Sequence, residues 1–149
     1  MLQKTIFISS IIILSFTNVV NATTDTWFAN DDGTVTDVAT GLIWQQEDDD
    51  ITRNYDDAIT YCEDLSLAGE SDWRLPYAKE LTTIVDYKTS DPAIDDADFI
   101  GTNFLFPARY WTSSDNTNLG GNGVAMSFER GTVSTDSMGT LYYARCVRN

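Results

Sequence analysis

The segment NYDDAITYCEDL, residues 54–65, carries the clearest helix signal in the chain. Its apolar side chains recur at the three- and four-residue spacing of one helix face. They are Tyr55, Ala58, Ile59, Cys62 and Leu65. Asn54 is a good N-cap residue, and Asp57 stands three positions later, as in a capping box. The pattern predicts a helix that starts after Asn54 and turns Cys62 toward a core.

Short strands separated by turn residues precede this helix. Trp27 and Phe28, residues 34–38 and residues 42–46 read as strands because β-branched and aromatic residues dominate them. Asn30 to Gly33 has the composition of a tight turn, and Thr40-Gly41 joins the second and third strands. The first part of the chain therefore predicts a strand followed by a β-hairpin.

A second helix is predicted to begin with Pro76 in its first turn, where proline is favoured. Periodicity then fades over residues 88–107. Antiparallel strands are expected at residues 109–114, 124–129, 132–135 and 141–148. Helices set among antiparallel strands predict an α+β fold, with two helices packed on short sheets and long irregular loops.

The N-terminal residues have the pattern of an export signal. An apolar run from Ile6 to Phe16 follows Lys4, and small residues precede Ala22. We expect a signal peptide over residues 1–22, a domain over residues 23–149, and a protein exported to the periplasm, the cell surface or the medium. A spanning helix needs about 20 apolar residues, so no membrane insertion is expected after cleavage.

The chain has two cysteines, Cys62 and Cys146, and no histidine. An even number of cysteines in an exported chain indicates a disulfide. The alternative is a redox-active or metal-binding pair, for which the sequence offers neither a Cys-x-x-Cys motif nor an imidazole. Without histidine, Ser-His-Asp and Cys-His catalysis are excluded.

The formal net charge is −14 over 149 residues. Nucleic acids and anionic surfaces are bound through many Lys and Arg side chains, so we expect no nucleic-acid partner. Long-range repulsion also disfavours a polyanionic glycosaminoglycan as the ligand.

Further motifs occur in a fixed order along the chain. They are residues 33–37 (GTVTD), 40–44 (TGLIW), 58–62 (AITYC), 67–69 (LAG), 72–76 (DWRLP), 80–81 (EL), 110–114 (YWTSS) and 145–148 (RCVR). Together they closely resemble the Lcl C-terminal domain family over nearly all of residues 27–148. Trp44, Trp73 and Trp111 in these motifs are expected in the core, and Arg74 is expected to anchor a carboxylate or backbone carbonyls.

The resemblance implies a C-type-lectin-like fold, which is also seen in the formylglycine-generating, sulfatase-modifying family. It implies a disulfide between the first helix and the last strand, where Cys62 and Cys146 stand. Members of the Lcl family are exported bacterial proteins, and one branch forms the tip of collagen-like adhesins that recognise sulfated glycosaminoglycans. This chain has no Gly-x-y repeat.

Asp31, Asp32 and Asp37 are the candidate metal ligands, because several oxygens in a short loop suit calcium. A turn explains the same residues, and the complete EF-hand pattern is absent. The calcium-binding triplets of sugar-binding C-type lectins are absent as well. No cofactor is predicted, and the acidic composition is consistent with weak calcium binding at most.

These observations predict a non-catalytic, exported binding or surface-interaction module with a glycan or protein ligand, which could be adhesin-like. Loops on a rigid scaffold carry recognition, so residues 88–109 and 115–123 are the expected binding surface. The candidate contacts are Phe99, Phe104, Phe106, Tyr110, Asn116, Asn118 and Asn122. Two alternatives stay open: an enzyme of the formylglycine-generating-like fold with an unrecognised site, and a structural envelope protein without a small ligand.

Overall fold

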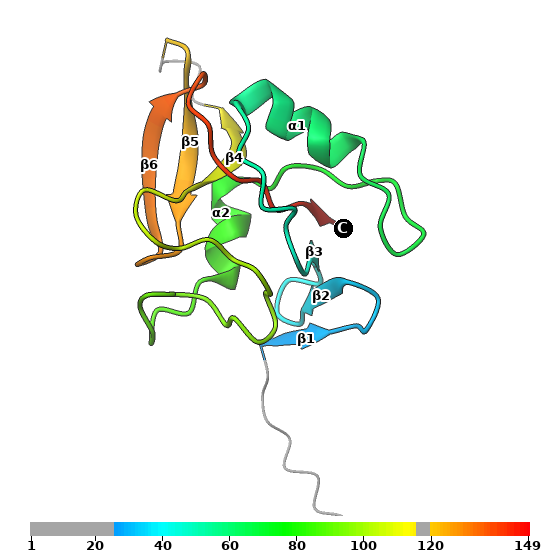
Figure 1. The fold of residues 1–149 in the computed structure, drawn as a ribbon. Coiled ribbons are helices and arrows are strands. Elements are labelled where there is room, and N and C mark those ends of the chain that lie inside the picture. The colour runs from blue at the N-terminus through cyan, green and yellow to red at the C-terminus, as the bar shows by residue number, and fades with distance from the viewer. Residues whose placement is uncertain (1–25, 116–119) are drawn as a thin grey trace, which may run out of the picture.

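The computed structural model describes residues 26–115 and 120–149 (Figure 1). The predicted signal peptide and the candidates Asn116 and Asn118 lie outside the described residues. In the part of the chain that is described, no helix has the length and apolar character needed to cross a bilayer.

Two antiparallel sheets and two short helices make up the described structure (Figure 1), which confirms the α+β prediction. The first sheet contains β1 (Trp27–Ala29), β2 (Thr34–Asp37), β3 (Ile43–Gln45) and β7 (Val147–Arg148). The second contains β4 (Tyr110–Asp115), β5 (Asn122–Ser127) and β6 (Thr132–Ser137). The helices are α1 (Tyr55–Glu63) and α2 (Ala78–Leu81), and a 3₁₀ turn, η1 (Thr82–Ile84), extends α2.

The first sheet has the order β1-β2-β3-β7, so it joins the start of the described chain to its end. Both predicted turns are present. Asp31 and Gly33 have φ of 58° and 86° in the β1–β2 turn, and Gly41 has φ of 77° in the β2–β3 turn. Because this left-handed region favours Gly, Asn and Asp, these residues are the local reason for the two reversals.

Helix α1 follows the sequence prediction closely. The Asn54 side chain accepts a hydrogen bond from the Asp57 backbone nitrogen at 2.9 Å. Tyr55, Ala58 and Cys62 are buried on its inner face. Cys62 forms a disulfide with Cys146, with a Cα–Cα distance of 5.4 Å, which confirms the expected link between the first helix and the C-terminal segment.

Helix α2 begins later than predicted, with Pro76 outside it. The Tyr77 backbone nitrogen donates to Glu80 Oε2 at 2.8 Å, and the Ala78 nitrogen donates to Ser114 Oγ at 2.7 Å. A side chain from β4 therefore satisfies one of the amides at the start of the helix, which have no partner within the helix itself. This contact ties the YWTSS motif to the segment after the DWRLP motif.

The core falls into two clusters of buried apolar side chains. Trp44 belongs to the cluster between the sheets and α2, whereas Trp73 and Trp111 belong to the cluster that includes the disulfide. All three tryptophans are buried as predicted. Arg74 binds Glu80 through two hydrogen bonds of 2.8 and 2.9 Å, which confirms its predicted role as a carboxylate anchor.

The predicted last strand over residues 141–148 is wrong, because only Val147–Arg148 is a strand. The residues before it cross from the second sheet to the first (Figure 1). Tyr142 pairs with Arg53, the Tyr143 nitrogen donates to the Arg109 oxygen at 2.9 Å, and the Gln45 nitrogen donates to the Cys146 oxygen at 2.9 Å. Since its partners change every residue or two, this segment cannot form one continuous ladder.

Candidate functional site

A buried ion pair joins the C-terminal segment to the acidic loop after β3. Arg145 Nη2 lies 3.2 Å from Asp48 Oδ2, and the two side chains are 0% and 2% exposed. The acidic stretch over residues 47–50 has the composition of a solvated loop, but Asp48 is buried. Arg145 draws this one carboxylate inward, because a buried guanidinium requires a counterion.

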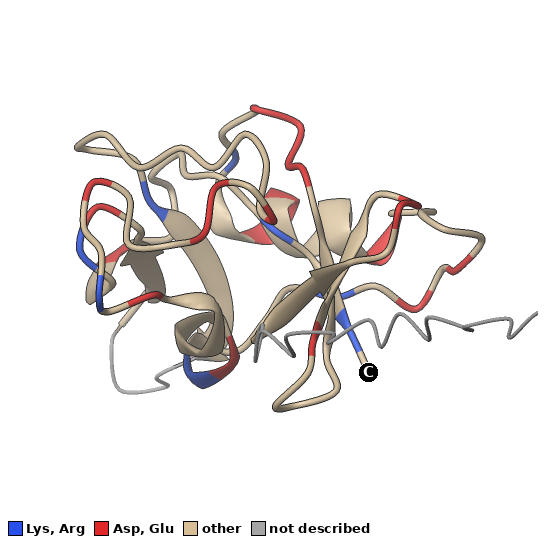
Figure 2. Cartoon of the chain, turned by 90° about the horizontal axis from the view of Figure 1, so that it is seen from below, with Lys and Arg blue, Asp and Glu red and all other residues tan. Residues whose placement is uncertain are grey.

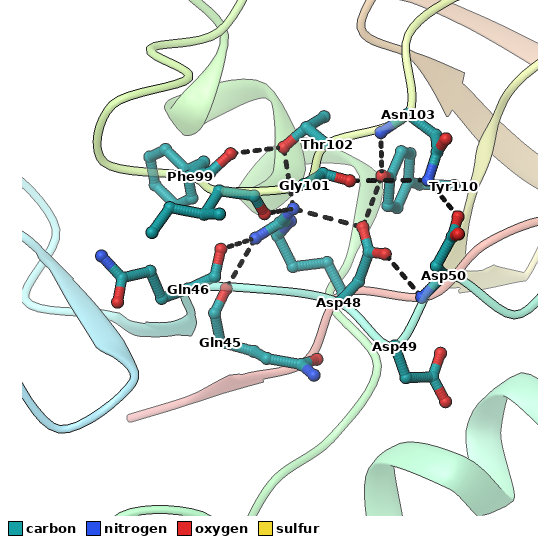
Figure 3. A network of polar contacts seen from close by, with 12 residues as sticks. Gln45, Gln46, Asp48, Asp49, Asp50, Phe99, Gly101, Thr102, Asn103 and Tyr110 are labelled. Atoms are coloured by element: carbon teal, nitrogen blue, oxygen red, sulfur yellow. Dashed lines mark hydrogen bonds and ion pairs between the residues drawn. The ribbon is translucent and has the colours of Figure 1, made fainter.

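Arg145 also holds two separate stretches of backbone (Figure 3). Its Nη1 donates to the Gln45 oxygen at 2.9 Å and to the Gln46 oxygen. Its Nη2 donates to Thr102 Oγ1 at 2.8 Å and to the Ile100 oxygen at 3.4 Å. One side chain therefore fixes the base of the irregular loop against the first sheet.

Tyr110 completes the network from β4. Its hydroxyl donates to Asp48 Oδ2 at 2.6 Å and accepts from the Asn103 nitrogen at 2.7 Å (Figure 3). Burial raises the pKa of Tyr110 far above its ordinary value. Burial also raises the pKa of Asp48, although the charge of Arg145 and the hydrogen bond from Tyr110 oppose the rise. These groups are structural partners inside the core.

A cleft of about 550 Å³ lies next to this network. One wall is the loop over residues 102–109 and the other is the segment over residues 140–143, with Thr52 between them. The described lining residues are Thr52, Thr102, Asn103, Phe104, Leu105, Pro107, Ala108, Arg109, Thr140, Leu141, Tyr142 and Tyr143. This volume lies within the range of small-molecule sites.

Arg109 is the only charged side chain among the described residues that line the cleft. Its side chain is 22% exposed, and its Nε lies 4.0 Å from Asp136 Oδ2 on β6. Its Nη1 is buried and has no hydrogen-bond partner among the described residues. Burial raises the pKa of Tyr142, and the charge of Asp136 raises it further, so this phenol is neutral at neutral pH.

The structure places the predicted contact residues in three different settings. Phe99 and Tyr110 are fully buried in the core, so they do not face a ligand. Phe104 lines the cleft. Phe106 is 76% exposed beside it, without contributing to its lining. Asn122 starts β5, where it pairs with Ser137 away from the cleft.

The predicted loop over residues 88–109 supplies one wall of the cleft through its last part, whereas the described residues of the predicted partner loop over residues 115–123 do not line it. Residues 140–143 supply the other wall, and residues 141–143 belong to the segment that the sequence predicts as the last strand. Leu141 is 58% exposed, and the apolar and aromatic run that it begins with Tyr142 and Tyr143 was the available signal.

The metal candidates act as turn residues in the described structure. Asp32 Oδ1 accepts from the Thr34 nitrogen and hydroxyl at 3.1 and 2.6 Å. Asp37 is buried, and it accepts from the Ala39 nitrogen at 3.0 Å and from the Thr83 hydroxyl at 2.7 Å. Over the described ranges, no cluster of three or more acidic or cysteine side chains suited to a metal is found.

The motifs noted in the sequence meet in this structure. The YWTSS segment caps α2, the Arg of RCVR holds the loop and the Cys of RCVR holds α1. Among curated proteins, none matches the chain. The family model of the Lcl C-terminal domain matches residues 33–148, and the chain therefore belongs to the Lcl C-terminal domain family.

Proposed function

We propose that this chain is a non-catalytic binding module whose ligand occupies the cleft between residues 102–109 and residues 140–143. The observation that carries the proposal is an apolar cleft with one wall held in place by buried hydrogen bonds from the core. Arg145 and Tyr110 hold Thr102 and Asn103, at the start of one wall, by hydrogen bonds of 2.8 and 2.7 Å. A wall fixed before the ligand arrives lowers the entropy lost on binding.

Exposed apolar side chains border the same cleft and support its role in recognition. Leu105 is 73% exposed and Leu141 is 58% exposed, one on each wall. Grouped apolar residues on a protein surface usually mark a binding site, whereas single ones are ordinary. The acidic residues are spread over loops on several sides of the molecule (Figure 2), so the cleft is distinguished by its apolar lining.

The absence of catalysis in this proposal rests on the chemistry of the groups at the cleft. Asp48 and Tyr110 have raised pKa values, but both are buried and bonded to each other. The cleft lining holds no carboxylate, thiol or lysine among its described residues. General acid–base and nucleophilic catalysis most often use such a group, and the pKa values of the lining phenols Tyr142 and Tyr143 are raised above the ordinary value.

The proposal includes export of the protein, and its ligand is a glycan, a protein or a small organic molecule. The disulfide is compatible with an oxidising compartment and supports export. The net charge of −14 disfavours nucleic acids and polyanionic glycans as partners, because like charges repel.

The test is a set of NMR titrations with neutral glycans, short peptides and small organic molecules against ¹⁵N-labelled protein. We expect the ligands that bind to shift the amide signals of residues 102–109 and 140–143. Leu141→Ser should weaken binding at least tenfold. Val133→Ser on β6 is the matched control, because Val133 is similarly exposed but lies outside the cleft lining. Ligands whose shifts map elsewhere would overturn the proposal.

A further inference from the structure

We propose that the cleft selects a small organic carboxylate with an apolar body, and that the carboxylate pairs with Arg109. This inference rests on the proposed function, since it names the chemistry of the ligand of the same cleft.

The first argument is that Arg109 is poorly compensated compared with other arginines of the chain. Arg74 makes two hydrogen bonds of 2.8 and 2.9 Å to Glu80, and Arg148 lies 2.6 Å from Asp72. Arg145 has an ion pair and several backbone partners. Arg109 has one carboxylate oxygen, 4.0 Å from its Nε, and its other side-chain partner is the uncharged hydroxyl of Tyr142.

The nearby carboxylate is also shared. Asp136 Oδ2, the atom closest to Arg109, accepts a hydrogen bond from Ser134 Oγ at 3.0 Å. Asp136 further interacts with the Tyr142 hydroxyl and contributes to its raised pKa. Among the described residues, the positive charge of Arg109 is therefore compensated only by a carboxylate at 4.0 Å that Ser134 and Tyr142 share.

Because Arg109 is partly buried, water solvates its charge less than it solvates the charge of an exposed arginine. Arg130 is similarly distant from a carboxylate, at 3.8 Å from Glu129, but its side chain is 71% exposed and water solvates it. Arg109 is 22% exposed, and its Nη1 is buried without a partner. A buried donor left unsatisfied is unfavourable, and a carboxylate is the group that best matches a guanidinium. A ligand carboxylate in the cleft would lie beside this guanidinium.

The other residues that line the cleft indicate that the rest of the ligand is apolar. Phe104, Leu105 and Leu141 offer apolar surface on both walls, and covering the exposed leucines removes that surface from water. A neutral sugar would leave Arg109 with the shared carboxylate of Asp136 as its only counterion among the described residues. The net charge of −14 repels a polyanion through each of its charges, whereas a ligand with one carboxylate carries a single repelled charge.

The experiment compares two ligands of the same shape, 3-phenylpropionate and 3-phenylpropionamide, by NMR titration of the exported, disulfide-bonded protein. We expect the carboxylate to bind at the cleft with at least tenfold higher affinity than the amide, because a charged hydrogen bond is replaced by a neutral one. This comparison uses the unaltered protein, so it does not depend on the folding of any variant.

Arg109→Gln should remove the tenfold preference, and Arg130→Gln should preserve it, because Arg130 has the same charge but lies outside the cleft lining. Equal affinity for acid and amide, both shifting cleft residues, would overturn this inference and leave the proposed function standing. Tighter binding by a Phe-terminated peptide or a sulfated disaccharide than by 3-phenylpropionate would overturn the small-carboxylate assignment. If no glycan, peptide or small molecule shifts the cleft residues, both proposals fail.

Discussion

Arg145 and Asp48 are 97 positions apart in the chain, yet their side chains meet 3.2 Å apart inside the protein. The pair connects the segment that precedes β7 to the loop that follows β3. The same guanidinium also fixes Thr102 at one wall of the cleft, at 2.8 Å. Stability of the core and the shape of the cleft therefore depend on a common set of contacts.

Asp48→Asn should destabilise the protein by about 3 kcal/mol, because the buried Arg145 would lose its counterion. Asp49→Asn is the matched control. Asp49 pairs with Arg53 near the surface, where an ion pair contributes about 1 kcal/mol or less. Urea unfolding of both variants measures the difference. An equal decrease in the free energy of unfolding for both variants would show that the buried Asp48 ion pair contributes no more than the surface pair of Asp49.

The Glu80 carboxylate should make stability sensitive to acid. Burial opposes its ionisation, but hydrogen bonds from Arg74 and the Tyr77 nitrogen outweigh burial and hold its pKa below the ordinary value. A carboxylate whose pKa is lowered in the folded state stabilises the protein above its unfolded pKa, near 4.3, and loses that effect as the pH falls through the folded pKa. The stability gap between the wild type and Glu80→Gln should therefore be full at pH 6 and shrink below about pH 4. Urea unfolding from pH 6 to pH 3 tests this, and a gap independent of pH would contradict it.

Replacement of both Cys62 and Cys146 by alanine should lower the free energy of unfolding by about 4 kcal/mol, since the disulfide spans a sequence separation of 84. The chain-entropy model behind this figure places the effect in the unfolded state. Urea unfolding with and without reductant measures it. A loss of stability on reduction in the wild type, but not in the double variant, is the expected control result.

Gly123→Ala should destabilise the protein by about 1–3 kcal/mol through overpacking. An added Cβ would stand 2.9 Å from Trp111 Cζ3 and 3.0 Å from Tyr55 Cδ2, and both rings are buried. Gly139→Ala is the control, because the nearest atom to its added Cβ is 3.8 Å away. Thermal unfolding compares them, and similar melting temperatures would refute the close packing of β5 on α1.

The parts of the fold that sequence analysis predicted are those with local causes. Helix α1 has its cap, Asn54, three residues from the amide that it binds. The turn at Gly41 requires only the conformational freedom of that residue. Helix α2 was placed too early because its amide partner is Ser114, a residue of β4 that no local pattern reveals.

The α+β composition, the first helix with its buried face, the hairpin turns and the pairing of the two cysteines can be predicted from the amino-acid order. They follow from periodicity, backbone preference and the number of thiols. The burial of Asp48 beside a near-surface Asp49, and the cleft between residues 102–109 and residues 140–143, depend on the three-dimensional arrangement of the chain. The physical reason is distance along the chain. Whether a charge is solvated and where a cleft opens depend on which remote segments become neighbours. Arg145 brings several such segments together because it hydrogen-bonds to residues of each.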